Sequence, residues 1–232
     1  MKKYEYLLFD ADNTLLDFNE AERRAFRFTC DKCGLNYTDD LQEIYSEINL
    51  SLWKKLERGE VTMEFLKLER FRLFLVHYDG EERDDTTDRA GEMKNTYMLA
   101  LSEQGCTIDG AEELCANLSK EYKMYIVTNG IAKIQRSRLA LSGLLPYFRG
   151  VFISEEIGHA KPSAGYFDHV IETIGERDLT KYLVIGDSLT SDCDGAIAYG
   201  LDICRYNPNN SSNNGRDLTY NITKLSDLYD IL

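Results

Sequence analysis

The sequence lacks a long apolar run, a basic patch and any internal repeat. No stretch approaches the roughly 18 apolar residues that a membrane-spanning helix needs, so we expect no membrane partner. Acidic residues outnumber basic ones, and the formal net charge is -13. Because no lysine- or arginine-rich segment offsets this charge, we do not expect binding to nucleic acid. Positive charge for an anionic substrate would have to come from a metal ion or a few lysines.

The 6 cysteines are scattered, without the spacing of a disulfide-rich secreted domain. Cys30 and Cys33 form a C-x-x-C pair, the pattern of a redox or zinc site, but no second pair completes a set of ligands. Two interpretations stay open: a redox or zinc pair, or two ordinary buried thiols. The N-terminal apolar stretch is short and lacks a small-residue cleavage site. We therefore expect no signal peptide, and a cytoplasmic protein with reduced thiols.

Two kinds of pattern follow one another along the chain. Residues 4–9 form a short apolar stretch that is typical of a buried strand. Residues 17–102 instead contain helical segments, with apolar residues at helical spacing and glycines such as Gly34 and Gly59 at their ends. After residue 103, strand-like and helix-like stretches alternate, and residues 201–206 are the last strand that we expect.

This order predicts an α/β fold, a Rossmann-like doubly wound parallel sheet with helices on both faces. The core would comprise residues 1–16 and 103–232, and an all-helical cap of residues 17–102 would be inserted after the first strand. The aromatic residues of the insertion, among them Trp53, Phe65, Phe71 and Phe74, allow two interpretations. They either stack on a substrate base or form the core of the helices.

Polar residues follow the expected strands, at the edge where ligands bind in such sheets. They are Asp10 and Asp12 after the first strand, Thr128 and Asn129 after the second, Lys161 after the third, and Asp187 and Asp192 after the fourth. Each group alone is explained by a turn, a helix cap or a surface lysine. Because all of them meet at one edge of one sheet, we interpret them together as one site.

The four groups resemble the signature motifs of the haloacid dehalogenase superfamily of phosphohydrolases. D-x-D-x-T matches residues 10–14, the hydrophobic strand with its threonine matches "YIVTN", Lys-Pro matches 161–162, and G-D-x-x-x-x-D matches 186–192. The motifs occur in the family's order and cover the whole core. The helical insertion between the first and second motifs resembles the family's C1-type cap.

The resemblance implies a role for each acid of the first motif. Asp10 would be the nucleophile that forms an aspartyl-phosphate, and Asp12 would be the general acid and then the general base. Mg²⁺ would be held by the carboxylates of Asp10 and Asp187 and by the main-chain carbonyl of Asp12. The metal would allow an acidic protein to bring a carboxylate against a phosphate.

The same resemblance implies a phosphate-binding set. Thr128 and Lys161 would hold the phosphoryl oxygens, and main-chain N–H groups near Asn129 and Gly130 would add donors. Asp192 would orient Lys161 or a metal-bound water. The structural alternative for Asp192 is the N-cap of the helix that follows.

The presence of Asp12 weighs against a dehalogenase, whose leaving group needs no proton. "FDADNTLLDF" and "IGDSLTSD" resemble the pyrimidine 5′-nucleotidase branch of the family. We therefore expect a Mg²⁺-dependent phosphate monoester hydrolase of nucleoside 5′-monophosphates, a monomer or homodimer. Two alternatives stay open: a phosphatase or phosphomutase of sugar phosphates or phosphoglycolate, and a binding protein that has the fold without the activity.

Overall fold

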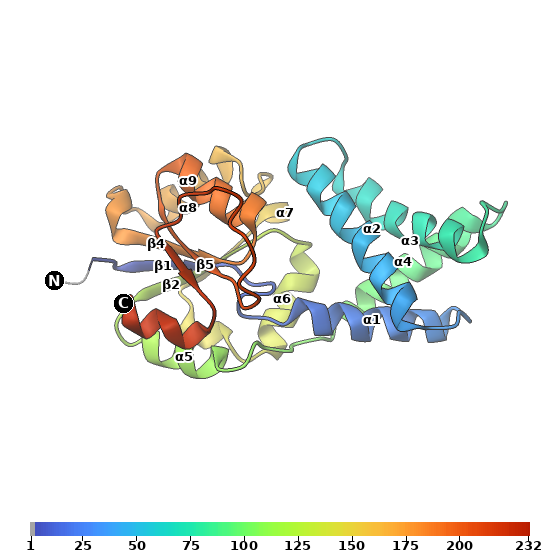
Figure 1. Ribbon diagram of the computed structural model, residues 1–232, viewed down its shortest axis with the longest axis horizontal. Helices are drawn as coiled ribbons and strands as arrows, with labels where there is room; N and C mark the ends of the chain where they lie inside the picture. Colours follow the sequence, from blue (N-terminus) through green and yellow to red (C-terminus); the bar gives the residue numbers. More distant parts are fainter. Residues whose placement is uncertain (1–2) are drawn as a thin grey trace. The chain divides into compact units, whose positions relative to one another are not determined.

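The computed structural model describes residues 3–232 (Figure 1). The chain divides into two compact units. The sheet unit comprises the chain up to Phe18 together with Gly105–Leu232, and the helical unit comprises Asn19–Gln104. Among the described residues, no helix combines the length and the apolar character needed to cross a membrane.

The sheet unit is built on six strands in the order β3-β2-β1-β4-β5-β6, and every neighbouring pair is parallel. The strands are β1 Tyr6–Phe9, β2 Lys123–Thr128, β3 Gly150–Ile153, β4 Tyr182–Gly186, β5 Asp202–Tyr206 and β6 Tyr220–Ile222. The first strand lies inside the sheet, and the chain adds strands outward on both sides of it. This is the doubly wound order, so the predicted α/β fold is confirmed.

Helices cover both faces of this sheet (Figure 1). They are α5 Ala111–Leu118, α6 Ala132–Leu141, α7 Ser154–Ile157, α8 Ala164–Ile174 and α9 Asp194–Tyr199, with the short turns η1 Leu145–Tyr147, η2 Leu179–Lys181, η3 Leu189–Cys193 and η4 Leu225–Asp230. Alternate residues of β1 face opposite layers. Leu7 and Phe9 belong to the cluster formed with α5, α6 and η4, whereas Tyr6 and Leu8 belong to the cluster formed with α8 and α9. The strand ends are therefore the place where polar groups can gather.

The sheet has a sixth strand beyond residues 201–206, the last clear strand in the sequence. β6 pairs with β5, with Cys204 opposite Tyr220 and Tyr206 opposite Ile222. It has three residues, and the exposed Asn221 stands at its centre. Such a short stretch carries no readable alternation, so its strand form depends on the neighbour that it pairs with.

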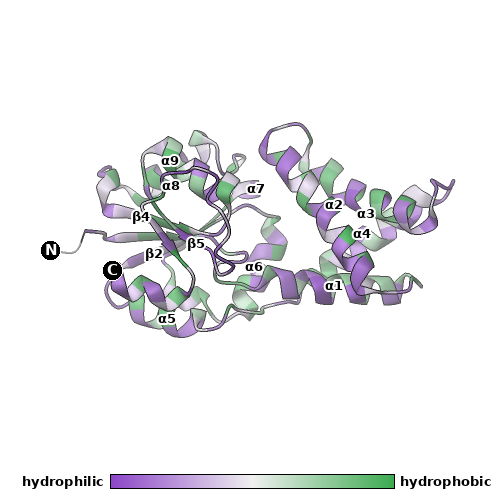
Figure 2. Ribbon diagram, in the orientation of Figure 1, coloured by the Kyte–Doolittle hydropathy of each residue, from purple (hydrophilic) through white to green (hydrophobic). Residues whose placement is uncertain are grey.

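The helical unit contains most of α1 Phe18–Lys32, together with α2 Asp39–Glu57, α3 Met63–Asp79 and α4 Thr86–Ser102. Polar and apolar residues mix along each helix (Figure 2), as expected of helices that bury one side. Threonine hydroxyls begin two of them. Thr38 accepts a hydrogen bond from the N–H of Leu41 at the start of α2, and Thr62 accepts one from Phe65 at the start of α3.

Aromatic rings form the centre of the helical unit. Phe26 stacks on Tyr45 with 4.3 Å between ring centroids and meets Phe74 edge-on at 4.9 Å. Phe71 and Phe74 are fully buried, whereas Phe65 is 48% exposed. Of the two interpretations of these aromatics, the core interpretation therefore holds for Phe71 and Phe74 within this unit.

The C-x-x-C pair lies at the end of α1. Cys30 is buried, and Cys33 is half-buried just after the helix. Burial raises the pKa of the Cys30 thiol to about 12, so this thiol stays protonated and unreactive at neutral pH. Within residues 3–232, neither cysteine belongs to a group of side chains that could hold a metal ion. These observations favour ordinary thiols.

Candidate active site

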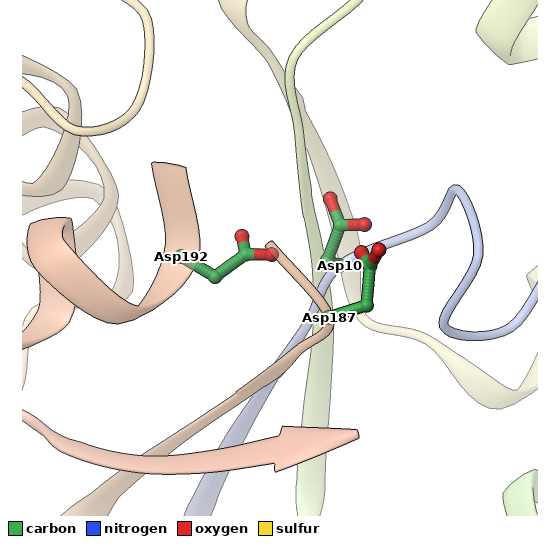
Figure 3. A group of neighbouring side chains, drawn as sticks. All are labelled: Asp10, Asp187 and Asp192. Carbon is green, nitrogen blue, oxygen red and sulfur yellow. The ribbon is translucent and has the colours of Figure 1, made fainter. Parts of the chain in front are cut away.

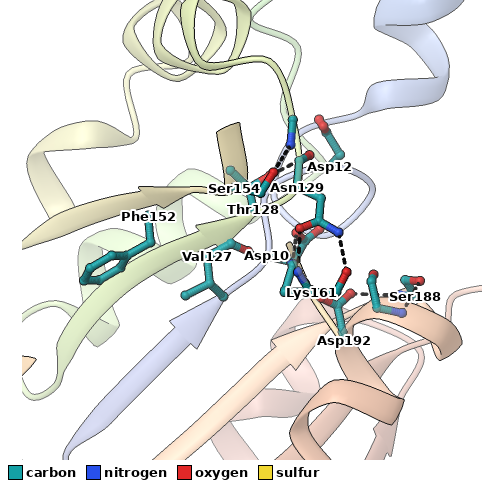
Figure 4. Close-up of polar contacts among 12 residues, drawn as sticks. Asp10, Asp12, Val127, Thr128, Asn129, Phe152, Ser154, Lys161, Ser188 and Asp192 are labelled. Carbon is teal, nitrogen blue, oxygen red and sulfur yellow. Dashed lines mark hydrogen bonds and ion pairs between the residues drawn. The ribbon is translucent and has the colours of Figure 1, made fainter. Parts of the chain in front are cut away.

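Lys161 stands at the centre of the site. Its ammonium donates to Asp10 Oδ1 at 2.6 Å, to Asp192 Oδ1 at 2.7 Å and to the main-chain carbonyl of Val127 at 2.7 Å (Figure 4). Burial disfavours a charged ammonium, but the carboxylates of Asp10 and Asp192 outweigh this effect and raise the pKa of Lys161. The lysine therefore stays charged and ties two acids to the end of β2.

A tight turn holds Asp10 at this edge of the sheet. Its N–H donates to the carbonyl of Ile185 on β4 at 2.8 Å, which continues the strand pairing past β1. The chain then reverses, with Asn13 in the left-handed region at φ 58 and the carbonyl of Ala11 accepting from Leu15 at 2.9 Å. Asparagine tolerates this conformation better than most residues, which is why the sequence can turn here.

Asn129 holds the backbone of Lys161. Its side-chain amide donates to the Lys161 carbonyl at 2.8 Å and accepts from the Lys161 N–H at 2.9 Å. Both ends of the side-chain amide thus position the lysine, a role that the sequence analysis did not expect. Sequence reasoning gave Asn129 only a main-chain donor.

Three carboxylates gather beside the lysine. The ligand atoms of Asp10, Asp187 and Asp192 all lie within 4.8 Å of one another (Figure 3). Burial raises the pKa of Asp10 well above its usual range, against the opposing effect of Lys161. Burial and then the charge of Asp192 raise the pKa of Asp187 to about 7. Two of the three acids bond the one ammonium of Lys161, and the third adds negative charge beside them, which suits a divalent cation.

The carboxylate of Asp192 is already engaged. One oxygen accepts from Lys161, and the other accepts from the N–H of Ser188 at 3.0 Å. Asp10 and Asp187 are therefore the better candidates for direct metal ligands, since oxygen donors of this kind suit Mg²⁺. A side chain at Gly186 would place its Cβ 2.4 Å from Asp192 Cγ, so the glycine permits this close approach.

The N-cap interpretation of Asp192 is wrong. Ser188 caps the turn, because its hydroxyl accepts from the N–H of Ser191 at 3.2 Å. Asp192 lies inside the π-helical turn η3, and α9 begins only at Asp194. The wider turn places the Asp192 carboxylate against the lysine instead of at a helix start.

Asp12 lies outside the group of three acids. Its Oδ1 accepts from Arg138 Nη1 at 2.5 Å, and its Oδ2 accepts from Gln135 Nε2 at 2.9 Å. Sequence reasoning missed both partners, although a signal exists: Gln135 and Arg138 interrupt the apolar face that Ile134 and Leu139 mark on α6. Polar residues on the buried face of a helix need partners.

Thr128 and Gly130 complete the end of β2. Thr128 Oγ1 accepts from Gln135 Nε2 at 3.0 Å, and Thr128 is buried. The N–H of Gly130 donates to the hydroxyl of Ser154 at 3.1 Å. The expectation that the Gly130 N–H is available to a phosphate is therefore not met in this structure, because Ser154 takes the bond.

Known proteins of similar sequence and fold identify the family. Residues 4–200 match the family model of the haloacid dehalogenase-like hydrolases. The HAD-hydrolase YfnB of Bacillus subtilis is 40% identical over 100% of this chain and 97% of its own. A magnesium-bound crystal form of YfnB superposes with a TM-score of 0.91, covering 100% of this chain and 99% of that one.

Two further relatives have a named substrate class. The pyrimidine 5′-nucleotidase PynA of Streptococcus pneumoniae is 37% identical over 99% of this chain and 95% of its own. The pyrimidine 5′-nucleotidase YjjG of Escherichia coli is 30% identical over 99% of this chain and 98% of its own. Since the family model and these relatives match over most of the sequence, the chain belongs to the haloacid dehalogenase-like hydrolase family.

Proposed function

We propose that this protein is a Mg²⁺-dependent phosphate monoester hydrolase that acts on pyrimidine nucleoside 5′-monophosphates. The observation that carries the chemistry is Asp10, a buried carboxylate bonded to the Lys161 ammonium and grouped with Asp187 at the carboxyl ends of the strands. The similarity to PynA and YjjG, which extends over almost the full length of all three chains, supports the substrate class.

The first step transfers the phosphoryl group to Asp10. A carboxylate oxygen of Asp10 attacks phosphorus, an O–P bond forms, and the P–O bond to the nucleoside breaks. The nucleoside oxygen that leaves takes a proton from the carboxyl group of Asp12. Because the Lys161 ammonium holds Asp10 Oδ1, the other oxygen is the attacking atom. Lys161 also offsets the charge that develops on the phosphoryl oxygens.

The second step releases phosphate. The carboxylate that remains on Asp12 accepts a proton from a water molecule while the water oxygen attacks the phosphorus of the aspartyl-phosphate. The bond between the Asp10 oxygen and phosphorus breaks, so inorganic phosphate leaves and Asp10 is again a carboxylate. Asp12 has its proton back, and the site is ready for another substrate.

The residues present suit a bound Mg²⁺. The carboxylates of Asp10 and Asp187 and the main-chain carbonyl of Asp12 would hold it, while Asp192 stays bonded to Lys161 and Ser188. When bound, the ion supplies positive charge beside the acids and the substrate phosphate.

A panel of phosphate monoesters tests the proposal. We expect phosphate release from pyrimidine 5′-nucleotides, with less from purine 5′-nucleotides, sugar phosphates and phosphoglycolate, and no release with chelator. Preference for a sugar phosphate would overturn the substrate class but not the chemistry. A folded protein that hydrolyses none of them with Mg²⁺ would overturn the enzyme proposal. Mg²⁺ should also raise the melting temperature of the wild type more than that of Asp187→Asn.

A further inference from the structure

Gln135 and Arg138 lie one turn apart on α6, and both side chains point toward Asp12. Gln135 is 3% exposed and Arg138 is 1% exposed. Burying a guanidinium and an amide is costly unless they find partners. Their partners are Asp12 and Thr128, two residues that the proposed function places in the reaction.

Hydrogen bonds connect the four side chains into one network. Arg138 Nη1 donates to Asp12 Oδ1 at 2.5 Å and to Gln135 Oε1 at 3.0 Å. Gln135 Nε2 donates to Asp12 Oδ2 at 2.9 Å and to Thr128 Oγ1 at 3.0 Å. Each carboxylate oxygen of Asp12 therefore receives one donor from α6 and keeps a lone pair for a proton.

Arg138 sets the direction of the network. A guanidinium can only donate, so the Gln135 oxygen must face Arg138 and the Gln135 NH₂ must face Asp12 and Thr128. Thr128 Oγ1 then accepts from Gln135, and its own proton has only a long contact, 3.5 Å, with the Asn129 carbonyl. That proton can be turned toward a phosphoryl oxygen.

The surroundings of the network hold it in place. The Phe18 ring lies 5.4 Å from the Arg138 guanidinium carbon. A Cβ at Gly130 would lie 2.7 Å from Gln135 Cγ, so this glycine makes room for the glutamine. The position of Arg138 thus depends on the flat ring of Phe18, and that of Gln135 on the missing side chain of Gly130.

We propose that Gln135 and Arg138 are positioning residues for phosphoryl transfer. They hold the Asp12 carboxyl in the orientation that delivers its proton to the leaving oxygen, and through Gln135 they orient the Thr128 hydroxyl toward the phosphoryl group. This inference rests on the proposed function, because it assigns these residues a role through Asp12 and Thr128.

Leaving-group dependence separates this role from a structural one. An activated aryl phosphate such as 4-nitrophenyl phosphate needs little help from a general acid, whereas a nucleoside 5′-monophosphate needs it fully. We expect Arg138→Met to lower kcat about 100-fold on the nucleotide and much less on the aryl phosphate. Gln135→Met should lower kcat on both substrates, because it also releases Thr128.

A double-mutant cycle gives the decisive result. In the Asp12→Asn background, Arg138→Met should cause a much smaller loss on the nucleotide than it causes in the wild type, measured at high enzyme concentration. Additive losses, equal losses of Arg138→Met on both substrates, or a faster Arg138→Met enzyme would each overturn the inference. Arg136→Met is the matched control, since Arg136 lies on the same helix, is exposed and pairs with Glu156 outside the network.

Folding and function can be told apart in the same experiment. Melting temperatures identify a variant that does not fold. The more conservative Gln135→Met then carries the test: its loss should be smaller in the Asp12→Asn background than in the wild type, and the loss that remains acts through Thr128. A wild type that is inactive on both substrates counts against the proposed function. An active wild type whose variants lose activity additively counts against the positioning role alone.

Discussion

The sheet unit and the helical unit both bury charged side chains, but they balance them differently. In the sheet unit, Lys161 pairs with Asp10 and Asp192, and the carboxylate of Asp187 lies within 4.8 Å of both acids. In the helical unit, Glu22 and Arg70 are buried one to one, joined by Asn49, which donates to Glu22 at 2.7 Å and accepts from Arg70 at 3.1 Å. The cluster around Lys161 therefore has an excess of negative charge, whereas the Glu22–Arg70 cluster is balanced.

The surroundings of the two clusters match this difference. Arg70 lies over the Tyr97 ring at 4.7 Å and the Phe71 ring at 5.0 Å, inside an aromatic core. The acids of the sheet unit lie instead at the strand ends, where polar ligands bind. A balanced buried pair leaves no net charge in the core, whereas an excess of buried negative charge is unfavourable until a cation binds beside it. We therefore interpret the Glu22–Arg70 cluster as structural.

Replacing the nucleophile should give the largest effect. Asp10→Asn keeps the shape of the site but removes the attacking carboxylate, so we expect kcat to fall at least about 10³-fold. Because the change also removes one of the crowded negative charges, the fold should survive, as checked by circular dichroism and melting temperature. Phosphate release from a pyrimidine 5′-nucleotide measures the loss.

Asp194→Asn is the matched control for that change. Asp194 begins α9 and pairs with Arg216 outside the acidic group. Its replacement should leave turnover near the wild-type rate. Retained turnover in a folded Asp10→Asn protein would contradict the nucleophile assignment. It would also mean that the acidic cluster is not the functional one of the two.

Removing the cation of the helical unit should act on stability. Arg70→Met leaves the buried Glu22 without its compensating charge, at a cost of about 3 kcal/mol in the free energy of unfolding. The double variant Glu22→Gln with Arg70→Met removes both charges and should cost less than the sum of the single changes. Urea unfolding of the full chain measures all three.

Arg72 supplies the comparison on the same helix. It is partly exposed and pairs with Glu69 and Glu82. Exposed ion pairs contribute little, so Arg72→Met should cost less than about 1 kcal/mol. Equal costs for Arg70→Met and Arg72→Met, or strict additivity in the double variant, would show that Glu22 and Arg70 do not form a coupled pair.

The sequence predicts the fold where its patterns are long and regular. β1 is readable as a buried strand because Tyr6–Phe9 are all apolar, and both faces of the strand pack against helices. β6 was not predicted because three residues around Asn221 carry too little pattern, and the pairing with β5 decides their conformation.

The site could be predicted in part for a similar reason. Asp10, Lys161 and Asp187 follow strands that end at the same edge, so the fold alone brings them together. Gln135 and Arg138 lie on a helix, where polar residues usually face solvent. Their place beside Ile134 and Leu139 indicates that they are buried, but it does not say which residues they contact. Only the packing of α6 against the sheet shows that they face Asp12.

The pH dependence of stability tests the charge excess of the sheet unit directly. Burial and the charge of Asp192 raise the pKa of Asp187 to about 7 in the folded protein, whereas an unfolded chain has an ordinary aspartate pKa of about 3.9. The folded state therefore holds a proton more tightly than the unfolded state. The stability that Asp187 contributes is complete below about pH 4 and is lost as the pH rises through about 7.

Asp187→Asn removes this dependence, because an amide does not titrate. Without divalent cations, the melting temperature of Asp187→Asn minus that of the wild type should rise between pH 4 and pH 8. Mg²⁺ should reverse the order at pH 8, since the ion binds the ionised carboxylates of the wild type. A difference that stays constant over this range would mean that Asp187 is not part of an excess of buried negative charge.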